Sequence, residues 1–325
     1  MLVVHNGKPV FRQGYGVTDL RTLHPIESDT DFRLASFTKQ FTAMCIMLLV
    51  HDGKLHYDDR LTDIFPEFPA YGRPITIRNL LNHTAGLPDY EDILTAQYPN
   101  IPDEQIPQIR DTGVLKLLEQ QTAGKFSAGS KWEYSNSGYV VLGLIVEKIS
   151  GKSFAQFLHE RIFAPLQMTN TLAYEKGKNE VPERAYGHTK EKDGWRETDQ
   201  SSTSATLGDG GIYSSVDDLV KWDSALRDHT LLSPKEMQPA LTPVVPTGGP
   251  ATSPDGAVSY GFGWFLSFYK GHKRMWHDGE TMGFRSTIQR FPDDNLTIIV
   301  LANRTDVDPK ELALKVADLY MPNGR

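Results

Sequence analysis

The segment Phe32-Arg33-Leu34-Ala35-Ser36-Phe37-Thr38-Lys39 leads directly into a regular apolar pattern near the start of the chain. The apolar side chains that follow are spaced to lie on one face of a helix that ends at Gly53: Phe37, Phe41, Met44, Cys45 and Leu48. Ser36 therefore stands at the beginning of a predicted helix. Lys39 follows one helical turn later on the same face.

This serine–lysine spacing has a chemical meaning. A serine hydroxyl is a weak nucleophile until a neighbouring base takes its proton. A lysine amine is such a base only where burial or nearby positive charge lowers its pKa from about 10.4 towards about 7–8. The unpaired N–H groups at the start of a helix would stabilise an oxyanion formed there. Ser36 and Lys39 are thus candidates for a nucleophile and its base.

The spacing alone is weak evidence, because the chain repeats it elsewhere. Ser267 and Lys270 have the same separation on a predicted strand, and Ser36 alone could be a plain helix N-cap. Two further motifs, Tyr134-Ser135-Asn136 and His277-Asp278-Gly279, are also imitated, at Tyr98-Pro99-Asn100, His5-Asn6-Gly7 and His51-Asp52-Gly53. The information therefore lies in the order and surroundings of the motifs.

Composition excludes several classes of function. The 325 residues include 34 Lys and Arg against 41 Asp and Glu, a net charge of −7 with no basic run, which argues against a nucleic-acid partner. Cys45 is the only cysteine, so neither an intrachain disulfide nor a thiolate metal cluster can form. No metal or other cofactor is predicted. The length corresponds to about two domains.

The N-terminal residues predict a β-hairpin, with Leu2-Val3-Val4 and Val10-Phe11 on either side of Asn6-Gly7. The longest apolar stretches, 45–50 and 139–146, are far shorter than the roughly 18 residues of a membrane span, and no signal peptide is visible. Because the sequence starts within a strand, we expect the natural gene to encode upstream residues. That expectation favours export to the periplasm or beyond.

Strands at both ends with helices between them predict an α+β protein built from both termini. Helices are expected at 75–82, 112–121, 139–149, 216–226 and 309–319, and strands at 260–268, 274–276, 284–291 and 296–301, with a turn at 293–295. Residues 188–206 predict a loop or hairpin, and 239–255 an extended loop. We expect a discontinuous mixed domain of residues 1–60 and 205–325, and a mainly helical lobe of residues 61–204.

Common catalytic and nucleotide-binding motifs fail in detail. Gly151-Lys152-Ser153 lacks the first glycine of a phosphate-binding loop, since Val146 stands there. The glycines at 208, 210 and 211 lack the spacing of a dinucleotide-binding loop, and His159-Glu160 lacks the second histidine of a zinc protease. No serine has the flanking glycines of an α/β-hydrolase nucleophile elbow.

Taken in order, five segments resemble the serine β-lactamase and penicillin-binding-protein family, particularly its class C-like branch. They are the nucleophile segment 32–39, Leu80-Leu81-Asn82-His83-Thr84-Ala85-Gly86-Leu87-Pro88, the stretch 129–139 around Tyr134-Ser135-Asn136, Gly210-Gly211-Ile212-Tyr213-Ser214-Ser215 with Asp218-Leu219, and Trp276-His277-Asp278-Gly279. The resemblance covers nearly the whole chain. It implies an antiparallel sheet flanked by helices, an all-helical lobe, and a site in the cleft between them.

The resemblance also implies roles for individual residues. Ser36 would be the acylated nucleophile, Lys39 its base, and Tyr134 the relay that protonates the leaving group. Asn136 would hold a substrate carbonyl or amide, and the backbone N–H groups of Ser36 and Glu280 would form the oxyanion hole. His277, Asp278, Gly279 and Glu280 would complete the substrate-binding strand, with His277 where many members have lysine.

Two positions depart from the pattern of the penicillin-recognising members. Asp278 replaces a small hydroxyl residue that helps to bind the carboxylate of penicillins, and Glu280 replaces a small residue beside the oxyanion hole. Neighbours on a strand alternate faces, so either side chain can point away from the cleft. If one faces it, β-lactam turnover is disfavoured and neutral or cationic substrates are favoured. A protonated His277 would offset part of that repulsion.

Other notable residues have structural interpretations. We expect His83 to bond a loop backbone and Cys45 to lie in the core. The Trp and Phe residues between 262 and 276 are expected to pack within the sheet.

The sequence thus predicts a serine hydrolase that works through an acyl-enzyme at Ser36. A carboxylesterase or D-peptidase-like activity on a small-molecule ester or amide is favoured. A true β-lactamase and a catalytically idle binder of peptides or cell-wall fragments are the alternatives. The presence of Ser36, Lys39, Tyr134 and Asn136 together counts against the idle binder. The natural substrate, the deacylation step and the oligomeric state stay open.

Overall fold

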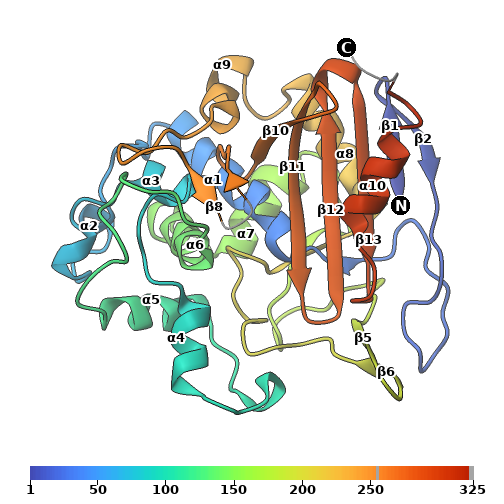
Figure 1. Cartoon of the computed structure of the whole chain (residues 1–325), viewed down its shortest axis with the longest axis horizontal. Coiled ribbons are helices and arrows are strands. Elements are labelled where there is room, and N and C mark those ends of the chain that lie inside the picture. The colour runs from blue at the N-terminus through green and yellow to red at the C-terminus, as the bar shows by residue number, and fades with distance from the viewer. Residues whose placement is uncertain (254–255, 322–325) are drawn as a thin grey trace.

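The main sheet joins the two ends of the chain. The structure is a computed structural model that describes residues 1–253 and 256–321. In it the strand order is β10-β11-β12-β13-β1-β2, with every neighbouring pair antiparallel. The strands are β1 (Leu2–His5), β2 (Lys8–Arg12), β10 (Phe265–Tyr269), β11 (His272–Thr281), β12 (Phe284–Phe291) and β13 (Leu296–Ala302). Figure 1 shows the blue N-terminal hairpin beside the red C-terminal strands.

Local turn chemistry explains two of the hairpins in this sheet. Asn6 and Gly7 join β1 to β2 with φ values of 52° and 75°, which a short polar residue and glycine tolerate best. Asn295, with φ of 48°, follows the turn Pro292–Asp294 between β12 and β13. Both turns lie where the sequence predicts them.

Helices cover both faces of the sheet. The C-terminal helix α10 (Pro309–Ala317) packs on β12 and β13, against Val3, Ile298 and Val300. Helix α8 (Val216–Asp228) packs on β1 and β13 from the other side, where Ile299 belongs to the large core. Because successive strand residues alternate faces, one strand supplies both layers of core.

The remaining helices lie beside the inner face of the sheet, on the left of Figure 1. They are α1 (Lys39–His51), α2 (Leu61–Ile64), α3 (Ile77–Leu81), α4 (Tyr90–Gln97), α5 (Asp111–Glu119), α6 (Asn136–Ser150), α7 (Phe154–Leu158) and α9 (Pro234–Met237). Helix α6 ends at Gly151, whose φ is 72°, and Ser153 caps α7 by accepting from the N–H of Gln156. The glycine and serine of the rejected phosphate-loop motif are therefore helix caps.

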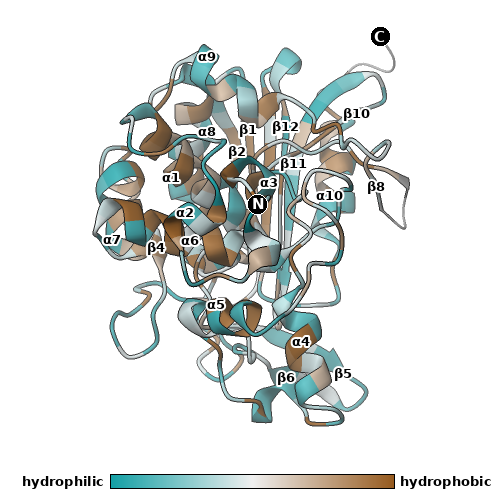
Figure 2. Ribbon diagram, turned by 90° about the vertical axis from the view of Figure 1, so that its left-hand side faces the viewer, coloured by the Kyte–Doolittle hydropathy of each residue, from teal (hydrophilic) through white to brown (hydrophobic). Residues whose placement is uncertain are grey.

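Helix α1 is more deeply buried than its sequence pattern predicts. Every residue from Lys39 to Leu49 is buried, including Gln40 and Thr42, because α6, α7 and the sheet side all pack around it. Figure 2 shows the hydrophobic residues of α1 and α6 in the interior, and the hydrophilic β5–β6 hairpin at the rim. Cys45 lies in this core, as predicted, and burial raises the pKa of its thiol.

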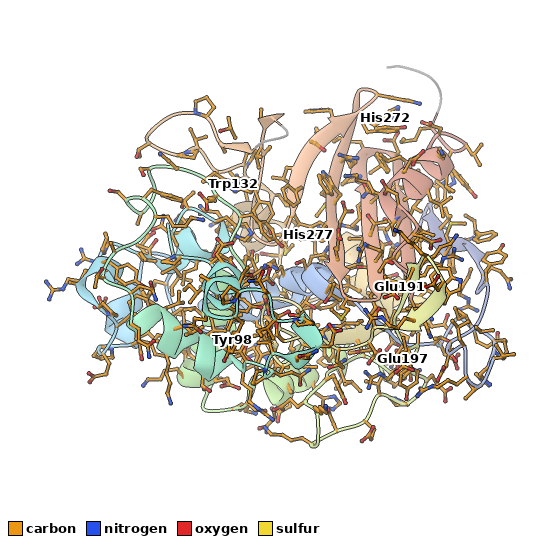
Figure 3. The ribbon with its side chains drawn as sticks, turned by 60° about the horizontal axis from the view of Figure 1, so that its bottom comes forward. Tyr98, Trp132, Glu191, Glu197, His272 and His277 are labelled. Atoms are coloured by element: carbon orange, nitrogen blue, oxygen red, sulfur yellow. The ribbon has the colours of Figure 1, made fainter. Side chains whose placement is uncertain are left out.

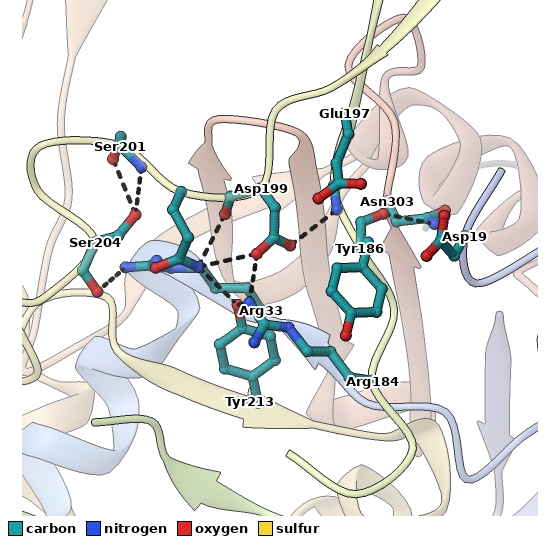
Figure 4. Close-up of polar contacts among 12 residues, drawn as sticks. Asp19, Arg33, Arg184, Tyr186, Glu197, Asp199, Ser201, Ser204, Tyr213 and Asn303 are labelled. Carbon is teal, nitrogen blue, oxygen red and sulfur yellow. Dashed lines mark hydrogen bonds and ion pairs between the residues drawn. The ribbon is translucent and has the colours of Figure 1, made fainter. Parts of the chain in front are cut away.

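Smaller sheets hold the segment before the nucleophile. Strands β3 (Phe32–Arg33), β4 (Leu172–Ala173) and β7 (Ile212–Ser214) form one sheet. Strands β5 (His188–Glu191) and β6 (Gly194–Glu197) form a hairpin within the predicted 188–206 region, and β8 (Thr252–Ser253) pairs with β9 (Gly256–Ala257). Figure 4 shows Arg33 bonded to Ser204 and Arg184 paired with Asp199. Arg33 also donates to the carbonyl of Gly210. These bonds tie the loop after β6 to the strand that precedes Ser36.

The fold class is confirmed: antiparallel sheets are flanked by helices, and the helices predicted at 75–82, 112–121, 139–149, 216–226 and 309–319 are all present. The extended loop predicted at 239–255 is only partly present: residues 239–241 belong to the 3₁₀ helix Gln238–Leu241, 247–250 form a turn, and residues 254 and 255 lie outside the described residues. The division into domains at residues 60 and 204 stays a prediction.

Candidate active site

The nucleophile candidate lies on a tight turn. Ser36 belongs to a short 3₁₀ turn, Ala35–Thr38, that runs directly into α1. Ala35, just before it, has φ of 50°. This left-handed backbone conformation is energetically unfavourable for any residue other than glycine. The turn brings the Lys39 Nζ within 2.9 Å of the Ser36 Oγ, so the structure joins the predicted serine–lysine pair.

Lys39 is fully buried and its amine is surrounded by acceptors. Its Nζ lies 2.8 Å from the Oδ1 of Asn136 and 3.0 Å from the carbonyl oxygen of Asp209, besides the Ser36 hydroxyl. The rings of Tyr134 and Tyr139 lie 4.9 and 5.6 Å from the same nitrogen. Every N–H of the ammonium form can thus be hydrogen-bonded, and the amine has one fixed position.

Burial and charge act on Lys39 in opposite directions. Burial disfavours the ammonium form and is the larger effect, so it lowers the pKa of Lys39 to about 8. Three carboxylates, those of Asp209, Glu91 and Asp89, oppose that shift. With a pKa of about 8, roughly a tenth of the amine is neutral at pH 7. Lys39 therefore meets the electrostatic requirement for a base.

Tyr134 lies beside this pair, and the same burial has the opposite effect on it. Burial raises the pKa of Tyr134 well above its ordinary value, because the charged form of a phenol is the anion. A hydrogen bond with the Ser36 hydroxyl opposes the rise without cancelling it. The phenol therefore stays protonated, which suits a proton donor.

Asn136 holds Lys39 from the first turn of α6. Its Oδ1 accepts from Lys39, and its backbone N–H donates to the Oδ2 of Asp89 at 2.8 Å. Asp89 also caps α4, because its Oδ1 accepts from the N–H of Glu91 at 3.0 Å. One carboxylate thus fixes the starts of two helices beside the site. The Asn136 Oδ1 is thus bound to Lys39, and the role of Asn136 in holding a substrate carbonyl or amide stays a prediction.

His277 lies on the inner face of β11 and is buried. Its Nδ1 lies 2.6 Å from the carbonyl of Asp278, which can only accept, so Nδ1 carries the proton and Nε2 accepts from the Tyr260 hydroxyl at 3.2 Å. Burial and the charge of Lys39 lower the pKa of His277 to about 3. The expectation that a protonated His277 offsets repulsion of a substrate carboxylate is therefore wrong at neutral pH. Figure 3 shows His277 near the centre of the molecule and His272 at the outer end of the strand.

Asp278 is wrongly predicted as a substrate-binding side chain. It pairs across the sheet with Thr287, which pairs with Val300 on the face that α10 covers. Its Oδ1 accepts from the Thr287 hydroxyl at 2.5 Å, and its Oδ2 lies 3.7 Å from the Nζ of Lys310 in α10. Alternation along β11 turns this carboxylate away from Ser36.

Gly279 lets β11 approach the nucleophile turn. A Cβ there would lie 2.0 Å from the carbonyl oxygen of Leu34 and 2.4 Å from the Oγ of Ser286, and that hydroxyl itself donates to Leu34. The glycine is thus a packing requirement. Next to it, Glu280 lines the cavity at Ser36, but its side chain is 73% exposed and turned to Arg285 at 2.7 Å.

The cavity at the nucleophile is small and acidic. Its volume is about 90 Å³, and its lining includes Ser36, Asn136, Glu91, Asp209 and Glu280. A wider cleft of about 680 Å³ shares Glu91 and Glu280 with it and is rich in serine and threonine hydroxyls. The site therefore has room for a substrate that extends well beyond the reacting bond.

Sequence reasoning missed two carboxylates of this cavity. The Asp209 Oδ2 accepts from the Tyr90 hydroxyl at 2.8 Å, whereas its buried Oδ1 has no hydrogen-bond partner among the described residues. Glu91 is partly open to solvent, yet the loss of water on its cavity side, reinforced by Asp209 and Asp89, raises its pKa to about 7. Asp89-Tyr90-Glu91 is recognisable in the sequence as a helix start, but not as part of a site.

The aromatic residues around 262–276 do more than pack the sheet. Phe262 and Trp264 are buried in the core, as predicted. Phe265 lies parallel to Tyr134, with ring centroids 6.4 Å apart, and 5.3 Å from His277. It therefore forms one wall of the site.

Within the described ranges, no cluster of His, Cys, Asp and Glu side chains is arranged to hold a metal ion. Over the same residues, no helix combines the length and the apolar character needed to cross a membrane.

The antiparallel sheet, the flanking helices and the contact of Ser36 with the buried Lys39 define a β-lactamase-like protein of the serine hydrolase superfamily. The sequence model of the family described as Beta-lactamase matches residues 1–320. The chain belongs to this family.

Named relatives give the same assignment. Penicillin-binding protein 4* of Bacillus subtilis is 33% identical over 98% of this chain and 71% of its own length. A D-aminopeptidase of Cereibacter sphaeroides is 27% identical over 93% of the chain, which spans 55% of that protein. The D-amino acid amidase of Ochrobactrum anthropi SV3, in a structure complexed with L-phenylalanine, superposes with a TM-score of 0.79 at 26% identity, covering 98% and 92% of the two chains. These names point to hydrolase activity.

Proposed function

We propose that this protein is a serine hydrolase that forms an acyl-enzyme at Ser36 and cleaves amides or esters of D-amino acids whose amino group is free. The observation that carries the proposal is the buried contact of 2.9 Å between Lys39 Nζ and Ser36 Oγ, with the pKa of Lys39 lowered to about 8. A structural lysine would gain nothing from losing its proton, whereas a base must lose it.

The reaction follows from the positions of these groups. The neutral Lys39 amine takes the Ser36 proton while Oγ attacks the substrate carbonyl carbon. The N–H groups of Ser36 and Glu280 then stabilise the oxyanion of the tetrahedral intermediate. Tyr134, which stays protonated, gives its proton to the leaving nitrogen or oxygen as the bond to it breaks, and regains one from Lys39. Water then cleaves the acyl-enzyme and releases the acid.

The charges around the nucleophile support a substrate ammonium group. Glu91 and Asp209 line the cavity, whereas Glu280 is paired with Arg285 and Asp278 lies on the opposite face. At about 5 Å and an effective dielectric of 20 to 80, a carboxylate attracts an ammonium by roughly 1–3 kcal/mol and repels a carboxylate by as much. A free amino group beside the scissile carbonyl is therefore favoured over the carboxylate of a penicillin.

The first experiment identifies the acylated residue. Intact-mass spectrometry after brief exposure to a fluorophosphonate, a penicillin and a p-nitrophenyl ester should show one added acyl or phosphonyl group, absent in Ser36→Ala. A wild-type protein that none of these reagents modifies would instead be the idle binder. Faster turnover of nitrocefin than of any amino acid derivative would make the protein a β-lactamase.

The second experiment tests the charge. Rates on D-phenylalanine p-nitroanilide and on its N-acetyl form are compared in wild type and Glu91→Gln at pH 7.5, where most Glu91 is ionised and the substrate's α-amino group, with an ordinary pKa of about 7.7–8.0, is still largely an ammonium. We expect Glu91→Gln to lower kcat/KM about 5- to 100-fold for the free amine and less than about 3-fold for the N-acetyl form. Asp278→Thr, on the far face, is the matched control and should affect both equally. Equal losses in Glu91→Gln would contradict ammonium recognition.

A further inference from the structure

His83 is a buried residue that the proposed chemistry does not use. It follows α3 in a turn, with 2% of its surface exposed and φ of 62°, a backbone conformation that favours glycine and asparagine. Its ring lies among four aromatic rings, with centroids at 4.4 Å for Tyr134, 4.6 Å for Tyr260, 5.1 Å for Tyr139 and 6.0 Å for Trp132. Trp132 is labelled in Figure 3.

His83 bonds the backbone on both sides of Tyr134. Its carbonyl oxygen accepts from the N–H of Glu133 at 3.0 Å, and its ring Nδ1 accepts from the N–H of Ser135 at 3.2 Å. Ser135 is in turn the N-cap of α6, and the next residue is the Asn136 that holds Lys39. A single residue, through its backbone carbonyl and its ring, thus holds the backbone on both sides of Tyr134 and next to Asn136.

The hydrogen-bonding state of the ring excludes two simpler roles. Because Nδ1 accepts from Ser135, the proton is on Nε2, and burial with the charges of Lys39 and His277 keeps the pKa of His83 well below its ordinary value. With Nδ1 occupied, the ring has no free lone pair with which to act as a base. Nε2 is buried without a hydrogen-bond partner in the described residues, which is energetically unfavourable. An apolar residue would fill the same space without burying an unpaired N–H. What an apolar residue cannot supply is the acceptor for Ser135.

We propose that His83 is a positioning residue that aims the Tyr134 hydroxyl at the leaving group by fixing residues 133–135. The proposal rests on the proposed function of Tyr134 as proton donor. Its signature is a dependence on the leaving group. An amide nitrogen must be protonated as it departs, whereas a p-nitrophenolate leaves without a proton. Misplacing Tyr134 therefore slows amide cleavage and spares p-nitrophenyl ester cleavage.

The test compares two variants, His83→Asn and His83→Leu. The Asn and Leu side chains are both branched at Cγ and have similar size. The Asn Oδ1 occupies the place of Nδ1 and tolerates the left-handed backbone, whereas Leu offers no acceptor. We expect His83→Leu to lower kcat for D-phenylalanine amide about 30-fold, and for D-phenylalanine p-nitrophenyl ester less than about 3-fold. His83→Asn should regain most of the amide rate. If His83→Leu does not fold, His83→Gly takes its place in the test. Glycine also lacks the acceptor, and it adopts the left-handed backbone conformation easily.

Tyr134→Phe separates this proposal from the proposed function. If Tyr134→Phe shows no amide-selective loss, Tyr134 is not the proton donor and the proposed function fails first. A second outcome is that Tyr134→Phe shows the amide-selective loss while His83→Leu slows amide and ester cleavage equally, or slows neither. In that case only the positioning role of His83 is overturned. The double variant should be no slower on the amide than Tyr134→Phe, since His83 acts through Tyr134. An additional loss in the double variant would contradict the proposal.

Discussion

Ser36–Lys39 and Ser267–Lys270 have the same spacing and opposite surroundings. Lys39 is fully buried among acceptors, and burial lowers its pKa to about 8. The Lys270 side chain is 49% exposed and pairs with Asp318 at 2.7 Å, which raises its pKa. Ser267 accepts hydrogen bonds from Arg274 at 3.0 Å and Trp276 at 3.1 Å, and Lys270 is not among its partners.

The difference shows that the protein environment, and not the spacing, decides whether the pKa of a lysine is lowered or raised. The helical turn after Ser36 directs the Lys39 amine back onto the serine hydroxyl. Lys270 instead occupies the turn between β10 and β11, with φ of 49° beside Gly271, and its side chain points to α10's C-terminal end at Asp318. The following predictions alter the two regions in parallel.

The largest expected effect is the loss of the nucleophile. Ser36→Ala should lower acyl transfer by at least about 10³-fold on every substrate, because no other group at the site replaces the hydroxyl. Ser267→Ala should retain the wild-type rate. The measurement is steady-state hydrolysis of p-nitrophenyl butyrate, with circular dichroism to compare the folds. Acylation of Ser267, or full activity in Ser36→Ala, would reverse the assignment of the two regions.

The next effect concerns the proton on Lys39. Because only the neutral amine accepts the Ser36 proton, kcat/KM for the non-ionising p-nitrophenyl acetate should rise with pH through about 8. His277, with its pKa lowered to about 3, does not titrate in this range. In Glu91→Gln the rise should persist but move to lower pH, because the Glu91 carboxylate raises the pKa of Lys39; its persistence excludes Glu91 as the titrating group. A flat profile between pH 6 and 10, after correction for spontaneous hydrolysis, would contradict Lys39 as base.

Stability should depend on the same proton. The pKa of Lys39 is lowered from 10.5 to about 8 on folding, so between these values the unfolded chain binds more protons than the folded one. The free energy of unfolding should therefore gain up to about 3 kcal/mol from this group as pH rises through that window. Lys39→Met should lack this gain, and Lys270→Met should keep it. Identical pH dependence in wild type and Lys39→Met would contradict the shift.

Local signals explain what the sequence could predict. The turn at Asn6-Gly7 and the helical turn that runs from Ser36 into α1 depend on residues next to one another, and the structure has both. The serine–lysine contact is local too, since one helical turn joins the two residues.

The rest depends on contacts between distant segments. Which face Asp278 occupies is fixed by the register of β11 with its neighbour β12, and a shift by one residue would reverse it. Asp209 and Glu91 reach Lys39 from separate parts of the chain. Neither the spacing nor the composition around Lys39 contains that information. The sequence therefore predicted the contact between Ser36 and Lys39, but not the charges that surround it.

Gly279 and Gly138 give a smaller, structural contrast near the site. Gly279→Ala would place a Cβ 2.0 Å from the Leu34 carbonyl oxygen, whereas Gly138→Ala in α6 meets Leu80 at an ordinary 3.5 Å. We expect Gly279→Ala to cost about 1–3 kcal/mol of unfolding free energy and to lower kcat/KM about 10- to 100-fold, as β11 moves from Ser36. Gly138→Ala should stay within about 1 kcal/mol of wild type. Chemical denaturation measures the unfolding free energy of both variants. Equal destabilisation by Gly279→Ala and Gly138→Ala would contradict the packing role of Gly279.

The smallest effect is expected at the turn that carries Lys270. Two-residue turns of this kind favour asparagine before glycine, and Lys270 with φ of 49° precedes Gly271 with φ of 88°. Lys270→Asn therefore exchanges an exposed ion pair with Asp318 for a better turn residue, and the two effects should nearly cancel. We expect the Tm to change by less than about 2 °C and the esterase rate by less than about 2-fold. Lys39→Asn should abolish activity in the same assay, because it removes the only amine that contacts Ser36 among the described residues. A loss above about 10-fold in Lys270→Asn would show that the outer lysine takes part in the chemistry.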